Sequence, residues 1–95
     1  MLLGKVIGTV WSTRKDEKLV GSKFLIVRHL NFDYTPKENS MIAIDSVGAG
    51  VGEIVLVAQG SSARQTLETQ NKPVDAVVMA IVDKLDVSVK DLVKE

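Results

Sequence analysis

The chain contains no cysteine and a single histidine, His29, among its 95 residues. Without cysteine it can form neither disulfides nor thiolate metal sites, and one histidine excludes a metal centre built from several imidazoles. Domains this small often draw stability from disulfides, metals or partner chains. Of these three sources, association with other chains is the one that the composition leaves open.

Net charge and aromatic side chains are also scarce. Twelve basic and twelve acidic residues give a formal charge of zero, and the aromatics are one tryptophan, one tyrosine and two phenylalanines. Proteins that bind nucleic acid draw affinity from a basic surface, and barrels that bind single strands stack bases on several exposed rings. We therefore expect no nucleic-acid partner.

The chain also lacks a long hydrophobic run. The longest unbroken apolar stretch is Ala76–Val82, which is far too short to span a bilayer. The first residues, Met1–Lys5, do not show a charged segment followed by an apolar core, so we expect no signal peptide. The expected location is the cytoplasm, without a membrane partner.

What the sequence does contain is short apolar segments rich in valine, isoleucine and threonine, a pattern typical of strands. No repeat or low-complexity segment divides the chain, so we expect one domain over residues 1–95. Polar connections are expected over Ser12–Gly21 and Asn31–Ser40. The five predicted strands are Leu3–Trp11, Lys23–Leu30, Met41–Val47, Glu53–Gln59 and Asp75–Leu85.

Two short helices complete the prediction. Gly60–Leu67 has a serine able to cap a first turn, and Ser88–Val93 has a serine followed three residues later by an acid, as in a capping box. Parallel strands need crossovers of a dozen or more residues, which these segments do not offer. A small, mostly antiparallel barrel removes exposed edges. The predicted fold class is all-β, a five-stranded OB-like β-barrel with one or two short helices.

Two of the predicted strands, Ile54–Ala58 and Ala76–Val82, are apolar on both faces. A strand of a small barrel normally alternates, with one face in the core and the other in water. Each valine or leucine left in water forgoes roughly 1.5–3 kcal/mol, so something must cover the outer face. We favour a second subunit as the cover; the alternative is that the chain's own loops and C-terminal helix fold over it.

The glycine-rich turn Gly48–Gly52 must be distinguished from the glycine-rich loops that bind nucleotides. A dinucleotide fingerprint precedes a helix, whereas a predicted strand follows this turn, and the Gly-Lys-Ser/Thr of a phosphate-binding loop is absent. We interpret the turn as a tight link that needs positive φ or very close packing. Its flanking acids, Asp45 and Glu53, lie near strand ends, where carboxylates often accept bonds from backbone N–H groups.

No set of catalytic residues can be assembled from the sequence. Gly60–Arg64 lacks the Gly-x-Ser-x-Gly pattern of a nucleophile turn, and the only histidine lies in a different strand. We interpret the segment as a helix start, with Arg64 bonded to a carbonyl or to a neighbouring chain; anion binding there stays open. His29 is interpreted as a surface or interface residue. We expect no enzymatic activity, no cofactor and no metal.

The segment Ala43–Val57 resembles the signature of bacterial microcompartment vertex proteins of the EutN/CcmL type. Further segments match that family at its own spacing, so that the resemblance covers nearly the whole chain. They are Gly4–Val10, Leu19–Val27, Gly60–Gln65, Pro73–Ala76 and Ala80–Asp83. Residues 31–40 and 86–95 fall in regions that vary within the family.

The resemblance implies a cyclic pentamer that caps the vertices of a polyhedral shell otherwise tiled by hexameric proteins, in carboxysomes or in catabolic compartments. It implies that Ser46, Val47, Gly48, Ala49 and Gly50 lie at or near the fivefold axis. It also implies that Ser61, Ser62 and Arg64 lie close to the subunit boundary. The competing hypothesis is a small OB-like ligand- or nucleic-acid-binding module that works as a monomer.

Overall fold

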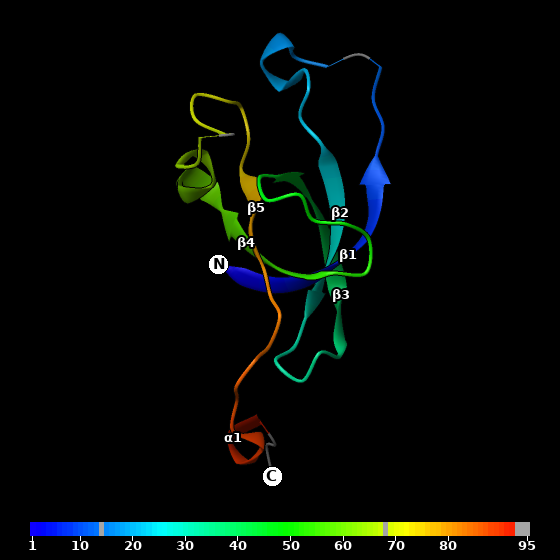
Figure 1. Ribbon diagram of the computed structural model, residues 1–95, viewed down its shortest axis with the longest axis vertical. Coiled ribbons are helices and arrows are strands. Elements are labelled where there is room, and N and C mark those ends of the chain that lie inside the picture. The colour runs from blue at the N-terminus through cyan, green and yellow to red at the C-terminus, as the bar shows by residue number, and fades with distance from the viewer. Residues whose placement is uncertain (14, 68, 93–95) are drawn as a thin grey trace.

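The computed structural model describes residues 1–13, 15–67 and 69–92, and of Val89 the backbone only. In this part of the chain five strands close into a barrel in the order β1-β2-β3-β5-β4 (Figure 1). The strands are β1 (Leu2–Val10), β2 (Phe24–Leu30), β3 (Pro36–Asp45), β4 (Ile54–Gln59) and β5 (Ala76–Ile81). The predicted five-stranded OB-like barrel is confirmed.

The barrel closes because β1 pairs with two neighbours along its length. Its first residues, from Leu2 to Lys5, pair with β4, and residues from Gly4 to Val10 pair with β2. Neighbouring strands run antiparallel except for β3 and β5, which are parallel where Ile44 lies opposite Val77. The expectation of a mostly antiparallel barrel is therefore correct, with one parallel seam.

The core is filled by alternate strand residues, as the pleat requires. Small and β-branched side chains dominate it, and Ala49, from the loop after β3, is one of them although it lies outside any strand. The cluster consists of Val6, Leu25, Val27, Ala43, Ala49, Val55, Val57, Ala76 and Val78. Because Ala49 is fully buried, the loop that carries it acts as a lid on the barrel.

Strand β3 begins earlier than predicted. We expected residues 31–40 to form a solvated loop, but the strand already starts at Pro36, and Pro36 and Ser40 lie opposite Leu30 and Arg28 of β2. Residues 36–40 are all exposed, so their polar composition is that of a solvent-exposed strand rather than of a loop. The first residue of a strand is a position where proline is tolerated.

The turn between β2 and β3 is consequently short and held by side chains. The Asn31 amide donates to the Thr35 hydroxyl, and the Thr35 backbone N–H and hydroxyl donate to the Asp33 carboxylate. Hydrogen bonds from the Thr35 side chain, and next from its backbone, lower the pKa of Asp33. Tyr34 adopts a φ of 70°, an uncommon conformation for a bulky residue. The turn carries two exposed aromatic side chains, Phe32 at 61% and Tyr34 at 44%.

Strand β5 is shorter than the predicted Asp75–Leu85. Its partner β4 begins at Ile54, and the N–H of Val82 makes the last bond, to the Ile54 carbonyl at 2.8 Å. Beyond this point the chain has no strand to pair with. It runs on as an extended segment to the single turn α1 (Val89–Leu92), where the Asp91 N–H donates to the Ser88 carbonyl. Val93, the last residue of the predicted helix, lies outside the described residues.

The first predicted helix is also shorter, and a turn was missed. Gly60–Leu67 is reduced to the 3-10 helix η2 (Gly60–Arg64), in which the Ser62 hydroxyl donates back to the Gln59 carbonyl instead of capping backbone N–H groups. In the polar connection after β1, the Asp16 carboxylate accepts from the Lys18 N–H and starts a second 3-10 turn, η1 (Glu17–Leu19).

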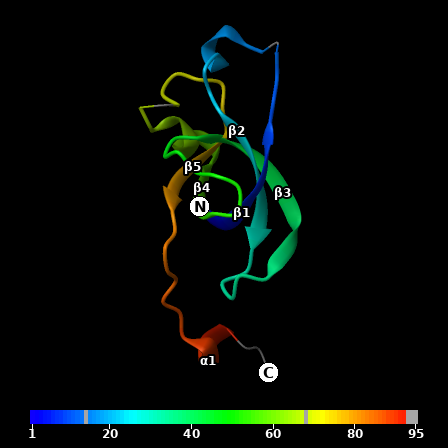
Figure 2. The same cartoon turned by 45° about the vertical axis from the view of Figure 1, so that its right-hand side comes forward.

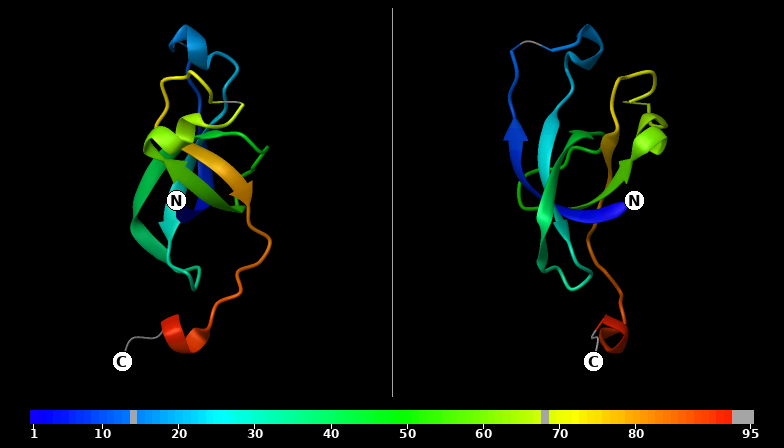
Figure 3. Two further views of the ribbon diagram at one scale, coloured as in Figure 1. Left: turned by 90° about the vertical axis from the view of Figure 1, so that its left-hand side faces the viewer. Right: turned by 180° about the vertical axis from the view of Figure 1, so that it is seen from behind.

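Connections gather at the two ends of the barrel (Figures 2 and 3). The turn η1 and the loop between η2 and β5 project at one end, whereas the β2–β3 turn and α1 project at the other. The molecule measures 50 × 23 × 21 Å, and the long dimension arises from these two sets of projections.

Candidate functional site

The glycine-rich loop that joins β3 to β4 is anchored by the acids that flank it. The Asp45 carboxylate accepts hydrogen bonds from the backbone N–H groups of Val47, Gly48 and Ala49, at 3.1, 3.1 and 3.2 Å. The Glu53 carboxylate accepts from the N–H of Gly50 at 2.7 Å. Both acids therefore bond to backbone N–H groups, as expected for carboxylates at strand ends.

Further contacts fix the same loop to the barrel wall. The Lys23 ammonium donates to the Ala49 carbonyl at 3.0 Å, and the Ser46 hydroxyl donates to the Val78 carbonyl at 2.6 Å. Gly48 and Gly52 adopt φ values of 78° and 96°, which glycine reaches without steric cost. The predicted need for positive φ is confirmed. The loop is thus a pre-formed element rather than a flexible linker.

The five residues predicted at a fivefold axis differ in how they sit within this loop. Val47 and Gly48 are exposed, Ser46 and Gly50 are partly buried, and Ala49 points into the core. Ala49 could therefore line an opening only through its backbone, because its side chain lies in the core. On the far side of the loop Val51 is 64% exposed, so the loop presents two valines to the outside of a single subunit.

The outer face of β4 and β5 is covered by the chain itself over one half. The helix η2 folds over this half and buries Ala63 against Ala58 and Val77, with Met79 packed on the same cluster. For these residues the cover is intramolecular, as the alternative expected, but it comes from η2 and not from the C-terminal helix that the alternative named. This second, small hydrophobic cluster outside the barrel explains part of the apolar character of β4 and β5 on both faces.

The other half of that outer face stays open in the single subunit. Ile54, Leu56 and Ala80 are only partly buried, and Leu56 forms one wall of a hollow of about 350 Å³. The imidazole of His29 also lines this hollow, and its Nε2 atom is buried without a hydrogen-bond partner among the described residues. The hollow is lined by Met1, Leu2, Leu3, His29, Leu30, Asn31, Phe32, Lys37, Leu56 and Leu85.

The predicted boundary residues lie on η2. Ser61, Ser62 and Arg64 are exposed, and the Arg64 guanidinium donates to the Val74 carbonyl of the same chain at 2.8 Å. The sequence left two partners open for Arg64, a carbonyl group or a neighbouring chain, and the single subunit shows a carbonyl partner. The loop 46–53 and η2 lie on different sides of the barrel (Figure 3).

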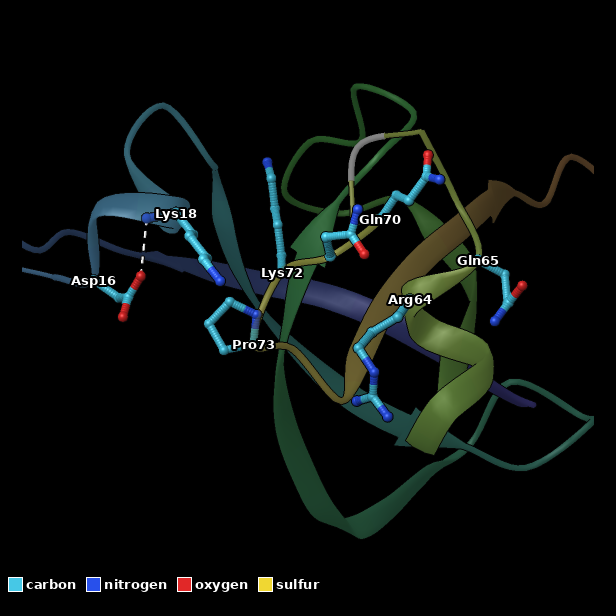
Figure 4. A pocket seen from close by; sticks show the side chains of 8 residues that line it. Asp16, Lys18, Arg64, Gln65, Gln70, Lys72 and Pro73 are labelled. Carbon is cyan, nitrogen blue, oxygen red and sulfur yellow. Dashed lines mark hydrogen bonds between the residues drawn. The ribbon is translucent and has the colours of Figure 1, made fainter.

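Next to η2 lies a polar hollow of about 640 Å³, whose lining includes Lys18, Arg64 and Lys72. Figure 4 shows that these side chains do not converge: Lys72 and Arg64 extend in opposite directions, and Lys18 reaches toward Pro73. Asp16 adds an acid to the same wall. An anion would thus find no common point at which several cations meet, and this hollow offers no built anion site.

Within the described residues, no group of three or more histidine, cysteine, aspartate or glutamate side chains could hold a metal ion. Among the same residues no helix combines the length and apolar character needed to cross a membrane. The described residues instead show a glycine loop held by hydrogen bonds and an outer barrel face that is half open; exposed apolar surface of this kind usually marks an interaction site.

Comparison with known proteins agrees with this geometry. Residues 1–83 match the family model described as ethanolamine utilisation protein EutN/carboxysome. The chain belongs to the EutN/CcmL family. The shell vertex protein GrpN of Rhodospirillum rubrum is 49% identical over 90% of this chain and 97% of its own length. The carboxysome shell vertex protein CcmL of Synechococcus elongatus is 46% identical over 92% and 88%.

Solved structures of the EutN/CcmL family carry the same barrel. The pentameric shell protein GrpN superposes with a TM-score of 0.85 at 48% identity, covering 93% of this chain and 100% of that one. CcmL of Gloeobacter violaceus superposes with a TM-score of 0.87 at 42% identity, over 92% and 90%. These relatives are named for their place in a shell rather than for a reaction, in agreement with the expectation that this family member is not an enzyme.

Sequence reasoning missed the hollow at His29 within this EutN/CcmL barrel. Leu56 was identified through the two-sided apolar pattern of its strand, but Phe32 and Leu85 lie in segments interpreted as loop and strand end. Their meeting depends on the short β2–β3 turn and on the path of the chain after β5. No local pattern in the sequence signals either feature.

Proposed function

We propose that five copies of this chain form a closed ring that occupies the vertices of a polyhedral bacterial microcompartment shell in the cytoplasm. The observation that carries the proposal is the likeness to the pentameric shell protein GrpN, at 48% identity and over 100% of that chain. Every part of that subunit therefore has a counterpart in this chain.

The mechanism is geometric. A flat sheet tiled by hexameric shell proteins cannot close, and fivefold units introduce the curvature that allows it to close. A ring of this kind uses a heterologous contact, in which one surface of each subunit meets a different surface of the next and the rotation closes. The half-open outer face of β4 and β5 supplies an apolar surface for one side of that contact.

The glycine loop fits the axis of such a ring. Five copies crowd together there, which favours residues as small as Gly48 and Gly50, and the bonds from Asp45 and Glu53 hold the loop without help from a neighbour. Ser46–Gly50 would line the opening, Ala49 through its backbone. Ser61, Ser62 and Arg64 would face the subunit boundary from η2, where all three are exposed.

Shell assembly with and without this chain tests the role at the vertices. Co-production of its partner hexameric shell proteins with this chain should yield closed particles in electron micrographs. Leaving this chain out should yield sheets or open shells in which the hexameric layer is intact. Normally closed particles in the absence of any vertex protein would contradict the proposal.

The alternative of an OB-like binding module is not favoured. Its basis was the barrel alone, whereas the likeness to shell vertex proteins extends over nearly the whole chain. The zero net charge further weakens binding to nucleic acid.

A further inference from the structure

The C-terminal segment after β5, residues 83–92, is hereafter the C-terminal arm. It leaves the barrel at Val82 and ends in α1 at the extremity of the molecule, beyond the β2–β3 turn (Figures 1 and 3). Its polar contacts stay within the arm: Lys84 pairs with Asp86 at 3.3 Å, and the Asp91 N–H donates to the Ser88 carbonyl. Thus the arm is not held by polar contacts to its own barrel in the described structure.

The arm nevertheless has the sequence of a segment that packs against something. Leu85 and Val87 alternate with polar residues, the pattern of an extended chain with one apolar side. Leu92 follows on α1, a helix of one turn. A single helical turn is unstable in water and forms where tertiary contacts support it. The apolar side of the arm therefore needs a packing surface, and the isolated subunit does not provide one along the whole arm.

The arm is long enough to reach a neighbour. Its six extended residues, 83–88, span about 20 Å at about 3.3 Å per residue. The two short dimensions of the molecule are 23 and 21 Å, which is the scale on which adjacent subunits of a ring are spaced. The family model matches residues 1–83, so nearly the whole arm follows the segment that the model describes.

The hollow at His29 offers a complementary surface on the neighbour. Its walls are mainly apolar, and Phe32, on its rim, is 61% exposed. Lys37 stands at the same hollow and has the charge opposite to that of Asp91, next to Leu92 on α1. Leu85, near the start of the same subunit's arm, also lines the hollow. If the end of a neighbour's arm bound there, it would contact the start of this subunit's arm, and the contact would repeat around the ring.

We propose that, in the ring on which the proposed function rests, the C-terminal arm of each subunit crosses to the next subunit and places Leu92 in its hollow at His29 and Phe32. Each subunit then donates one arm and receives one, so that a closed ring leaves neither an arm nor a hollow unused. The occupant of the hollow is a second copy of this chain, and the arm acts as a strap across the subunit boundary.

Engineered cysteines test the strap directly because the chain has none of its own. The full-length double variant Phe32→Cys/Leu92→Cys should, after mild oxidation, give a ladder of covalent species up to five subunits on a non-reducing gel. The matched control Trp11→Cys/Leu92→Cys has its first thiol at position 11, where Trp11 is 91% exposed. Trp11 follows Val10, which pairs with the first residue of β2, whereas Phe32 follows the last. This control should give no ladder.

The position of the disulfide decides between the possible outcomes. A disulfide within one chain, or no disulfide in a preparation that native mass spectrometry shows to be pentameric, would overturn the strap while leaving the ring intact. A preparation that contains only monomers would instead overturn the proposed function. The two failures are therefore distinguishable in one set of samples.

A second full-length variant measures the contribution of the strap. Leu92→Asp should raise the concentration at which the ring half-dissociates by at least about tenfold, because burial of one leucine is lost at each boundary. Leu92→Met keeps the apolar contact and should change that concentration by much less. Equal dissociation of the two variants and the unaltered protein would show that Leu92 makes no contact across the boundary.

Discussion

At the scale of single residues, glycine and the acids beside the loop carry the most information. The sequence predicted that the glycine turn needs positive φ or very close packing, and Gly48 and Gly52 show the first of these. It also predicted that Asp45 and Glu53 bond to backbone N–H groups, which is confirmed. These features are local, because they involve residues within a few positions of one another. The burial of Ala49 was not predictable in the same way, since it depends on where the loop lies over the barrel.

Gly4 illustrates a residue whose role depends on a distant neighbour. A Cβ atom at this position would lie 2.3 Å from Val27 Cγ1 and 2.9 Å from the Arg28 carbonyl oxygen. We expect Gly4→Ala to lower the free energy of unfolding by about 1–3 kcal/mol, because the backbone of β2 must move to make room. Urea-induced unfolding followed by circular dichroism measures the change.

Gly8 provides the matched control in the same strand. The nearest atom to a Cβ at this position is Ile26 Cδ1 at 3.5 Å, an ordinary contact. Gly8→Ala should therefore change the free energy of unfolding by less than about 1 kcal/mol in either direction. If the two alanine variants were equally stable, the close approach of β1 and β2 at Gly4 would not be a real constraint.

At the scale of elements, the number of strands and their closure into a mostly antiparallel barrel followed from the sequence, but the strand order around the barrel and the strand ends did not. β3 starts at Pro36 because β2 provides a pairing partner there, although residues 36–40 are polar. β5 stops at Ile81 because β4 begins opposite it. Strand ends are set by the partner strand, and a partner cannot be read from the segment itself. The cover over Ala58 and Val77 by η2 was likewise a tertiary feature.

The open half of the outer face gives a prediction at this scale. Leu56→Lys should leave the unfolding transition of the isolated subunit nearly unchanged, because Leu56 is only partly buried there. It should weaken the ring by roughly 1.5–3 kcal/mol per boundary, or about ten- to a hundredfold in the dissociation midpoint. Analytical ultracentrifugation over a range of concentrations measures that midpoint.

Leu56→Met is the control for this variant, since methionine conserves volume and apolar character and such exchanges are usually tolerated. Its ring should remain as stable as that of the unaltered protein to within about threefold. A Leu56→Lys ring that dissociates no more readily than the methionine control would remove this half of β4 from the boundary.

At the scale of the whole molecule, the barrel is one part of a larger object. A chain of 95 residues without cysteine, with an outer face half covered and an arm that extends past its own barrel, is consistent with a subunit whose stability is shared with its neighbours. The resemblance found in the sequence led to the family, and the comparisons establish it. The arm and the hollow at His29 could be recognised only once the fold placed them.

Native mass spectrometry of the purified, unaltered chain at micromolar concentration decides whether it forms the ring. We expect a dominant species of five times the 10.3 kDa chain mass, with dissociation only on dilution or activation. A stable monomer at that concentration would contradict the proposed ring.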